Sequence, residues 1–234
     1  MLSQLHPWNV SPAEAIKIQQ ELRSNIIIQK FDKPIQYVAG ADISFDKGSD
    51  IIYAAVVVLK YPELTEVDRG LTVTRVTFPY IPGLLSFRES PAVLEAWEYL
   101  HIRPDVLLID GHGYAHPRRF GLACHLGLLL DVPTIGCAKT VLVGKFEEPN
   151  REAGSFRPLM DRDEVVGAAL RTSEGVRPVY VTVGHLVDLE SAIKVVLKCC
   201  RGYRIPEPTR QAHLLVNALR RGEGQTDTRQ ASLF

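Results

Sequence analysis

A run of four apolar residues at positions 106–109 constrains the fold of this chain more than any other feature. Such a run is typical of a strand buried on both faces, as in a sheet that helices cover from both sides. The run ends at Asp110, and Gly111 and Gly113 then let the backbone turn sharply or approach another molecule closely. Open α/β sheets bind ligands at the carboxyl ends of their strands, so Asp110 is either a functional carboxylate or the cap of a turn.

The chain after Asp110 predicts a second strand beside the first. The connecting loop carries four side chains that can bind an anion: His112, His116, Arg118 and Arg119. An apolar helix is expected over residues 122–130, and a strand over residues 132–138 ends at Lys139. A helix between two strands indicates a parallel crossover, which puts Lys139 on the same sheet edge as Asp110. Lys139 therefore either contacts a phosphate there or is an exposed loop charge.

A second carboxylate, Asp42, lies inside a strand predicted over residues 35–45. Its neighbours in the segment VAGADISF are small or apolar, which does not fit a solvated surface position. Buried acids are rare unless they are paired or bound to a metal. Asp42 is therefore a candidate functional residue.

A third acid, Glu89, precedes a predicted helix that runs to about residue 100. Ser90 is a suitable N-cap with Pro91 at the first helical position, which leaves Glu89 just before the helix and free to point elsewhere. The alternative is a capping box between Ser86 and Glu89. That alternative puts Pro91 inside the helix, where proline fits less well.

The remaining patterns predict the rest of the chain. A capping box at Ser11 and Glu14 begins a helix that ends near residue 28 and is expected to cover the sheet. An antiparallel meander is expected from three strands, at residues 35–45, 51–60 and 71–78. Residues 144–162 read as irregular, and the C-terminal half adds strands at 165–170 and 179–183 and helices at 188–200 and 209–219.

Residues 79–83, with the sequence PYIPG, are expected to form a stiff loop, because two prolines fix much of the backbone. Tyr80 within it either folds back into the core or protrudes. A protruding aromatic ring on a stiff loop is suited to insertion into a stack of bases.

Three meander strands followed by a helix and strand–helix–strand units is the order of a ribonuclease-H-like α/β fold. In that fold the first strand's carboxylate lies beside the end of the fourth strand, so Asp42 and Asp110 are expected to be neighbours. Two adjacent carboxylates repel, and a hard divalent cation that prefers oxygen ligands removes the repulsion. With Glu89 as a third acid, the cluster suits magnesium-assisted hydrolysis of a phosphodiester.

Charge and cysteine content narrow the partners and the compartment. The formal net charge is +0, so binding to nucleic acid requires a local basic patch. The four cysteines include the adjacent pair Cys199 and Cys200 and no CxxC spacing, which fits neither a disulfide framework nor a zinc site. A reducing compartment is expected, the cytoplasm, with no signal peptide and no membrane span.

Four segments closely resemble the endonuclease V family, the nucleases that repair deaminated purines. They are VAGADISF, PYIPGLLSFRE, PDVLLIDGHGYAHPRRFGLACHLG and GCAKT. The resemblance covers about residues 35–219, and the segments occur in the family order. It implies one ribonuclease-H-like domain, assigned here to residues 1–220, whereas the polar residues 221–234 predict a disordered tail.

The resemblance implies a Mg²⁺-dependent cut, with Mn²⁺ as a substitute, in DNA that contains deoxyinosine, the nucleotide of hypoxanthine. The cut falls at the second phosphodiester bond 3′ to the lesion and leaves 3′-hydroxyl and 5′-phosphate ends. The protein is expected to be a monomer. Two other functions stay open, an endoribonuclease acting on inosine in RNA and a catalytically silent nucleic-acid-binding module, although the presence of all three acids argues against the module.

The resemblance also implies roles for individual residues. The metal ligands would be Asp42, Glu89 and Asp110, and His213 matches a position of the active site or a second metal. Lys139 and His116 match residues near the phosphates. The strand-separating wedge matches Pro79, Tyr80, Ile81 and Pro82. The flipped base is expected in a pocket lined by Gly83, Leu85, Gly111 and Leu122, whose backbone could read the 6-oxo edge and exclude a 2-amino group.

The last residues of the chain resemble a second, unrelated motif. QASLF, with Gln230, Leu233 and Phe234 at the key positions, is similar to the QxxLF-type peptide by which bacterial replication and repair proteins bind the sliding clamp. A polar tail that places two apolar anchors in a groove is a common mode of peptide recognition. The tail therefore predicts a clamp partner.

Overall fold

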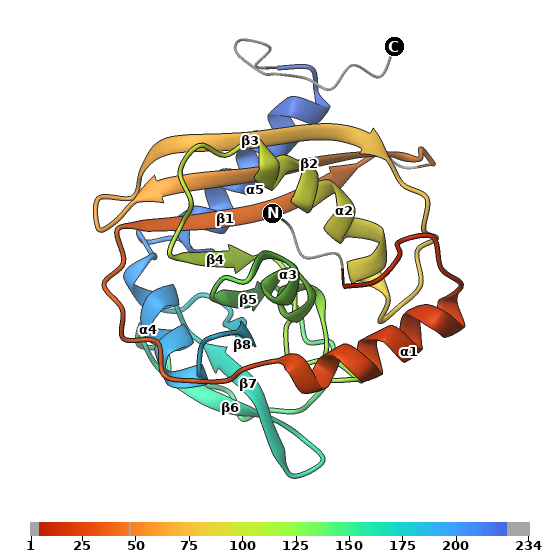
Figure 1. Cartoon of the computed structure of the whole chain (residues 1–234). Helices are drawn as coiled ribbons and strands as arrows, with labels where there is room; N and C mark the ends of the chain where they lie inside the picture. The colour runs from red at the N-terminus through yellow and green to blue at the C-terminus, as the bar shows by residue number, and fades with distance from the viewer. Residues whose placement is uncertain (1–4, 47, 224–234) are drawn as a thin grey trace.

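The computed structural model describes residues 5–46 and 48–223 and has a mixed sheet at its centre (Figure 1). The sheet has eight strands in the order β3-β2-β1-β4-β5-β8-β7-β6. The strands are β1 (Tyr37–Phe45), β2 (Ile51–Lys60), β3 (Thr65–Arg75), β4 (Val106–Ile109), β5 (Thr134–Ala138), β6 (Phe156–Asp161), β7 (Glu164–Leu170) and β8 (Val179–His185). The α-helices are α1 (Pro12–Leu22), α2 (Leu85–Glu98), α3 (Leu122–Leu130), α4 (Leu189–Lys198) and α5 (Glu207–Arg220).

The pairing of the strands confirms the predicted ribonuclease-H-like sheet. β1, β2 and β3 form the antiparallel meander, and β4 and β5 add parallel to β1. The second half of the sheet, β8, β7 and β6, then continues antiparallel. The carboxyl ends of β1, β4 and β5 consequently meet at one edge.

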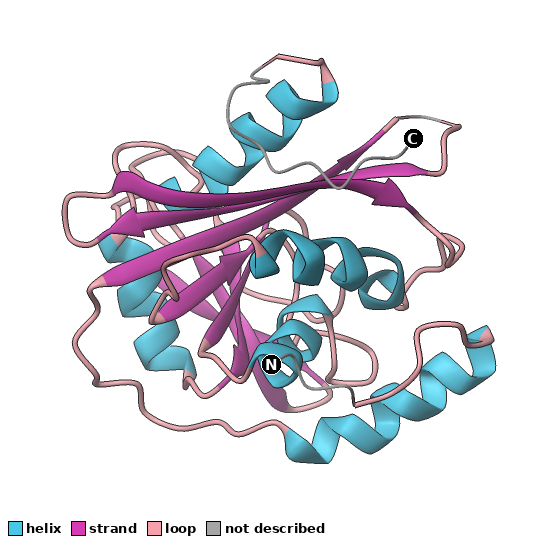
Figure 2. Ribbon diagram, turned by 45° about the horizontal axis from the view of Figure 1, so that its top comes forward, coloured by secondary structure: helices cyan, strands magenta, loops and turns pink. Residues whose placement is uncertain are grey.

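Two hydrophobic clusters lie on opposite faces of the sheet. Helices pack over both faces, as Figure 2 shows. Side chains alternate between the faces along β4, so Val106 and Leu108 pack toward α4 and α5, whereas Leu107 and Ile109 pack toward α2 and α3. This double burial explains why the β4 sequence is apolar at every position.

α5 crosses β1 at close range, at the one strand position without a side chain. A Cβ on Gly40 would lie 2.0 Å from the carbonyl carbon of Pro208, so only glycine permits this approach. The crossing brings the helix that carries His213 against the strand that carries Asp42.

The start of α2 differs from both predicted caps. The helix begins at Leu85 with no side-chain cap, and Pro91 lies inside it. The hydroxyl oxygens of Ser86 and Ser90 are buried without a partner. The first turn is instead stabilised by burial, because Leu84 and Phe87 pack with Phe78 and with Ala15 of α1. Glu89 is therefore part of the helix and buried, rather than free before it.

Three other sequence-based boundaries were also wrong. The third strand lies at Thr65–Arg75, earlier than residues 71–78, and the segment expected to be irregular contains β6. The predicted N-terminal helix ends at Leu22 and continues as a short 3₁₀ turn, Arg23–Asn25. α1 packs on the 78–87 segment rather than on the sheet, because its apolar side meets Phe78 and Ile81. None of the described helices is long and apolar enough to cross a membrane.

Candidate active site

Three carboxylates lie near enough to influence one another where β1, β4 and α2 come together, and we call Asp42, Glu89 and Asp110 the acidic cluster. Ala41 pairs with Ile109 across the parallel strands, so the next residues, Asp42 and Asp110, are neighbours as predicted. The backbone N–H of Asp110 donates to the carbonyl of Ala41 at 3.4 Å. Glu89 comes from α2, whose face toward the sheet is buried.

Burial and like charge disfavour the ionised form of two members of this cluster. Burial raises the pKa of Glu89 to about 8, and the charges of Asp42 and Asp110 add to the effect. Burial also raises the pKa of Asp42, with a further contribution from Asp110. Carboxylates perturbed in this way are typical of functional sites.

Two basic side chains partly balance the acidic cluster. The ammonium group of Lys139, at the end of β5, forms an ion pair with Asp110. The Nδ1 of His213, on α5, lies 2.7 Å from Oδ2 of Asp42. The structure therefore brings together all five residues predicted to be catalytic.

The donor set of the acidic cluster fits a hard divalent cation, because it offers only carboxylate oxygens and comes from three separate elements. In residues 5–46 and 48–223, no three His, Cys, Asp or Glu side chains are gathered closely enough to hold a metal as they stand. Asp110 is paired with Lys139, and Asp42 with His213. Burial, and after it the neighbouring carboxylates, raise the pKa of both Glu89 and Asp42, and a bound cation would oppose these effects.

A cavity of about 490 Å³ lies beside the acidic cluster. All four residues predicted for the base pocket line it: Gly83, Leu85, Gly111 and Leu122. Asp110 and Lys139 line it as well, so the cavity opens onto the cluster. Tyr80, at its rim, is 67% exposed, which excludes the alternative in which the ring folds back into the core.

The carbonyl oxygen of Gly83 accepts from three side chains, and we call Gln19, His116 and Arg118 the Gly83 clamp. Nε2 of Gln19 lies at 3.1 Å, Nε2 of His116 at 3.0 Å and Nη2 of Arg118 at 2.5 Å. His116 is buried, and this burial lowers its pKa to about 4, with help from the charge of Arg118. A neutral His116 ring in the cavity wall is thus suited to hydrogen bonding rather than to charge pairing.

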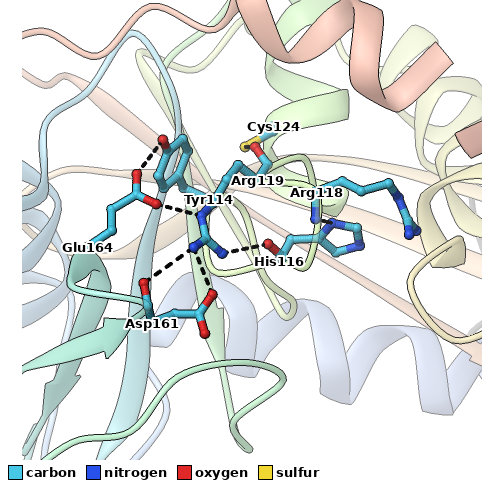
Figure 3. A network of polar contacts seen from close by, with 7 residues as sticks. All are labelled: Tyr114, His116, Arg118, Arg119, Cys124, Asp161 and Glu164. Carbon is cyan, nitrogen blue, oxygen red and sulfur yellow. Dashed lines mark hydrogen bonds and ion pairs between the residues drawn. The ribbon is translucent and has the colours of Figure 1, made fainter. Parts of the chain in front are cut away.

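The neighbouring Arg119 points away from Arg118, into a separate polar network (Figure 3). Its guanidinium donates to Glu164 at 2.8 Å and to Asp161 at 2.7 Å. Tyr114 donates to the other oxygen of Glu164 at 2.7 Å. Arg119 therefore ties the 111–121 loop to the β6–β7 hairpin, and the sequence alone had left its role unassigned.

Sequence reasoning missed Gln19, because a polar residue in an amphipathic helix gives no signal of its own. It is 1% exposed and is the one buried polar side chain of α1 in the described structure. Thr182 of β8 was also missed, although its hydroxyl accepts from the backbone N–H of Gly113 at 2.8 Å and fixes the loop. Neither position could be found without knowing which segments pack together.

A ribonuclease-H-like sheet with carboxylates gathered at adjacent strand ends beside a cavity defines the class of protein: a phosphodiester-cleaving nuclease. The comparison with known proteins gives the family. The Endonuclease V family model matches residues 20–214, and the chain belongs to that family. The protein is therefore an endonuclease, which excludes the catalytically silent binding module.

Individual relatives agree with this assignment over most of the chain. Endonuclease V of Gloeobacter violaceus is 52% identical over 220 residues, which cover 93% of this chain and 89% of the relative. The crystal structure of Endonuclease V from Streptomyces avermitilis superposes with a TM-score of 0.87 at 44% identity, over 92% of this chain and 96% of the other.

One solved relative contains nucleic acid. Endonuclease V of Ciona intestinalis, in complex with a 23mer DNA containing an inosine followed by a ribo-adenosine, superposes with a TM-score of 0.79 at 30% identity. The match covers 91% of this chain and 99% of the Ciona chain.

Proposed function

We propose that this protein cuts DNA that contains deoxyinosine, at the second phosphodiester bond 3′ to the lesion, and leaves 3′-hydroxyl and 5′-phosphate ends. The observation that carries the proposal is the acidic cluster at the mouth of a cavity large enough for a purine. Family membership and the inosine-containing DNA bound by the Ciona relative support the substrate.

Asp42, Glu89 and Asp110 would hold the divalent cation, Mg²⁺ or Mn²⁺ in its place. When bound, the cation lowers the pKa of a water and neutralises charge that develops on the phosphate. Lys139 pairs with Asp110 and lines the cavity, so its ammonium would bind a phosphate oxygen of the substrate there. His213, hydrogen-bonded to Asp42, orients that carboxylate and can move a proton at the same atom.

The cavity would take the flipped base, and the loop at residues 79–82 would act as the wedge. Tyr80 is exposed, and Pro79 and Pro82 stiffen the loop around it, so its ring can fill the gap that a flipped base leaves. The backbones of Gly83 and Gly111 line the cavity. Because the Gly83 carbonyl already accepts from three side chains, its N–H is the backbone group of Gly83 that can contact the purine edge. Flipping a weakly paired base, such as hypoxanthine, out of the duplex requires less energy than flipping a normally paired base.

The test is cleavage of a labelled duplex that contains one inosine, with Mg²⁺ or with EDTA, beside the same duplex with adenine. The expected result is one nick at the second bond 3′ to inosine, only with metal and only in the inosine strand. End-group analysis should give 3′-hydroxyl and 5′-phosphate. Cutting that ignores inosine, or that persists in EDTA, would contradict the proposal.

A second candidate substrate is inosine in RNA. The Ciona relative was crystallised with inosine followed by a ribonucleotide, which favours including RNA in the assay. Matched DNA and RNA strands of one sequence, cut under the same conditions, decide between the substrates. A higher kcat/KM on the RNA strand would make the endoribonuclease the main activity.

We also propose that Gln230, Leu233 and Phe234 bind a bacterial sliding clamp. These residues lie outside the described part of the structure, so the proposal rests on the QASLF sequence. Pull-down with clamp protein should retain the full chain and lose a chain that ends before residue 230. Equal retention of both chains would end the idea.

We also propose that the protein works in the cytoplasm and is a monomer. The cysteine pattern of the sequence, with the adjacent pair Cys199 and Cys200 and no CxxC spacing, supports a reducing compartment. Sedimentation of the purified protein at several concentrations tests the monomer.

A further inference from the structure

We propose that Gln19 of α1, together with Arg118, is a positioning residue that holds the wedge loop where it can separate the strands of a duplex. The inference rests on the proposed function, since it concerns how the same site opens its substrate. Gln19 lies outside the four segments that carry the family resemblance, and it enters the site only through tertiary packing.

The anchor point is the carbonyl of Gly83, the residue directly after the wedge. Its three donors come from two segments far apart in sequence, α1 and the loop that contains His116 and Arg118. A carbonyl oxygen has two lone pairs, so three donors, one of them a guanidinium, saturate it. The backbone at Gly83 is therefore held at a fixed position relative to the cavity.

The hydrogen bonds also determine the tautomer of His116. The backbone N–H of Arg118 donates to Nδ1 of His116 at 3.2 Å, so the ring proton must lie on Nε2. Nε2 then donates to the carbonyl of Gly83, as the 3.0 Å distance requires. The neutral ring is consistent with its lowered pKa.

The side-chain amide of Gln19 is the centre of this arrangement. Nε2 donates to the carbonyls of Gly83 and Phe120, each at 3.1 Å. Oε1 accepts from Nε of Arg118 at 2.5 Å. One buried amide thus connects the wedge, the start of α3 and the guanidinium. Its removal would leave buried polar groups without partners, which is costly.

The wedge is fixed at its base and free at its tip. Phe78 and Ile81 pack against Ala15 and other apolar residues of α1, whereas Tyr80 is 67% exposed. The packing and the Gly83 clamp together attach both ends of the loop to α1. Movement of Gly83 would therefore displace the aromatic ring that has to enter the duplex.

Because the wedge loop and the cavity act at different steps, loss of the Gln19 contacts should affect cleavage of a duplex and of a single strand differently. A single strand needs the cavity and the acidic cluster, whereas a duplex also needs the wedge to replace a stacked base. Loss of the Gln19 contacts should therefore reduce cutting of a duplex more than cutting of a single strand. A general loss of folding would reduce both equally.

The experiment compares Gln19→Leu with Gln20→Leu, the same substitution at the next position, where the side chain is exposed. Each variant is assayed with the full chain on one inosine-containing strand, alone and annealed to its complement. We expect Gln19→Leu to lower kcat/KM on the duplex by roughly 10- to 100-fold and on the single strand by less than about threefold. Gln20→Leu should match the wild type on both.

A fluorescent base supplies a readout that a purely structural role would not move. With 2-aminopurine beside the inosine, unstacking by the wedge raises the fluorescence, and the rise should be smaller for Gln19→Leu at saturating protein. Arg118→Met is the second variant, in case Gln19→Leu does not fold. Because both side chains act on one carbonyl, the double variant should be little worse than the more affected single variant.

Equal losses on the duplex and the single strand would overturn the inference, since the clamp would then serve the cavity or the fold. Unchanged duplex cleavage by a folded Gln19→Leu or Arg118→Met would also overturn it while the proposed function stands. A wild-type protein that cuts neither inosine substrate would instead refute the proposed function itself, and this inference with it.

Discussion

The acidic cluster reaches the cavity through Asp110 and the Gly83 clamp through Gln19 and His116, yet the two regions treat buried polar groups in opposite ways. In the acidic cluster, burial and then the neighbouring carboxylates raise the pKa of Glu89 to about 8. In the clamp, one carbonyl receives three donors, and the amide of Gln19 uses both its nitrogen and its oxygen. The first region is poorly satisfied without a ligand, and the second is satisfied by the chain itself.

The difference indicates that the acidic cluster takes part in the reaction and that the Gly83 clamp holds the wedge loop in position. A cluster that is electrostatically unfavourable in the free protein becomes more favourable when a cation binds, and this difference strengthens the binding of the cation and of a phosphate beside it. A saturated hydrogen-bond network gains nothing from a ligand but fixes geometry. Substitutions in the two regions should therefore affect different quantities, namely catalysis in the cluster and duplex opening or stability in the clamp.

The largest effect is expected at the acidic cluster. Asp110→Asn should lower the cleavage rate by roughly 10³-fold or more, because a neutral amide removes charge stabilisation worth several kcal/mol. Binding to inosine DNA, measured by fluorescence anisotropy, should persist. The control is Asp131→Asn, which is exposed and sits at φ 52°, a conformation that asparagine accepts. Normal cutting by Asp110→Asn would refute the mechanism.

The next largest effect is expected on the stability of the protein at acid pH, through His116 of the Gly83 clamp. The pKa of His116 is about 4 in the folded protein and 6.5 ordinarily, so between these values only the unfolded chain binds the proton. Stability should therefore fall as pH drops from 6.5 to 4, by about 3 kcal/mol from this ring. His116→Gln should show a weaker pH dependence in urea unfolding.

The matched control for the acid experiment is His101→Gln, because that side chain is 82% exposed. Loss of this side chain should change the pH dependence less than loss of His116. If His116→Gln follows the wild-type curve, the Gly83 clamp does not hold the ring neutral, and the contrast between the two regions weakens.

A smaller effect is expected at the anchor of the wedge. Gly83→Ala and Gly202→Ala place a side chain at similar backbone angles, φ +79° and +80°, which costs about 1–2 kcal/mol in each case. Only at Gly83 would the new Cβ meet Nη2 of Arg118, at 2.8 Å, because nothing lies within 4 Å of Gly202. Thermal unfolding should show a loss for both variants, larger for Gly83→Ala because of the contact with Arg118, whereas duplex cleavage should fall only for Gly83→Ala. Equal duplex cleavage by both variants would show that the Gly83 clamp does not position the wedge loop.

The smallest effect is expected in the Arg119 network. Glu164→Gln should cost about 1 kcal/mol or less, because the Glu164 side chain is 43% exposed and Asp161 still pairs with Arg119. Cleavage of duplex and single strand should stay at the wild-type level. A selective loss of activity would show that the β6–β7 hairpin takes part in positioning the cavity.

Much of the fold could be predicted because the hydrophobic pattern has a local cause. A strand that is apolar at every position, as at residues 106–109, has to be buried on both faces, and this alone places it in the middle of a covered sheet. The order of meander, helix and crossover then made Asp42 and Asp110 neighbours. The start of α2 could not be predicted, because burial of Leu84 and Phe87 outweighs the local preference of Ser90 and Pro91 for a helix start.

The sequence by itself determined the meander, the pairing of the first and fourth strands, the three candidate acids and the family, because these depend on residue types at fixed places along the chain. Tertiary structure alone decided how the site is held together. Gln19, Gly83 and Arg118 are separated by long stretches of chain, and their hydrogen bonds exist only after α1 has packed on the wedge loop. A hydrogen bond depends on distances of a few tenths of an ångström, and residue type and spacing along the chain do not specify them.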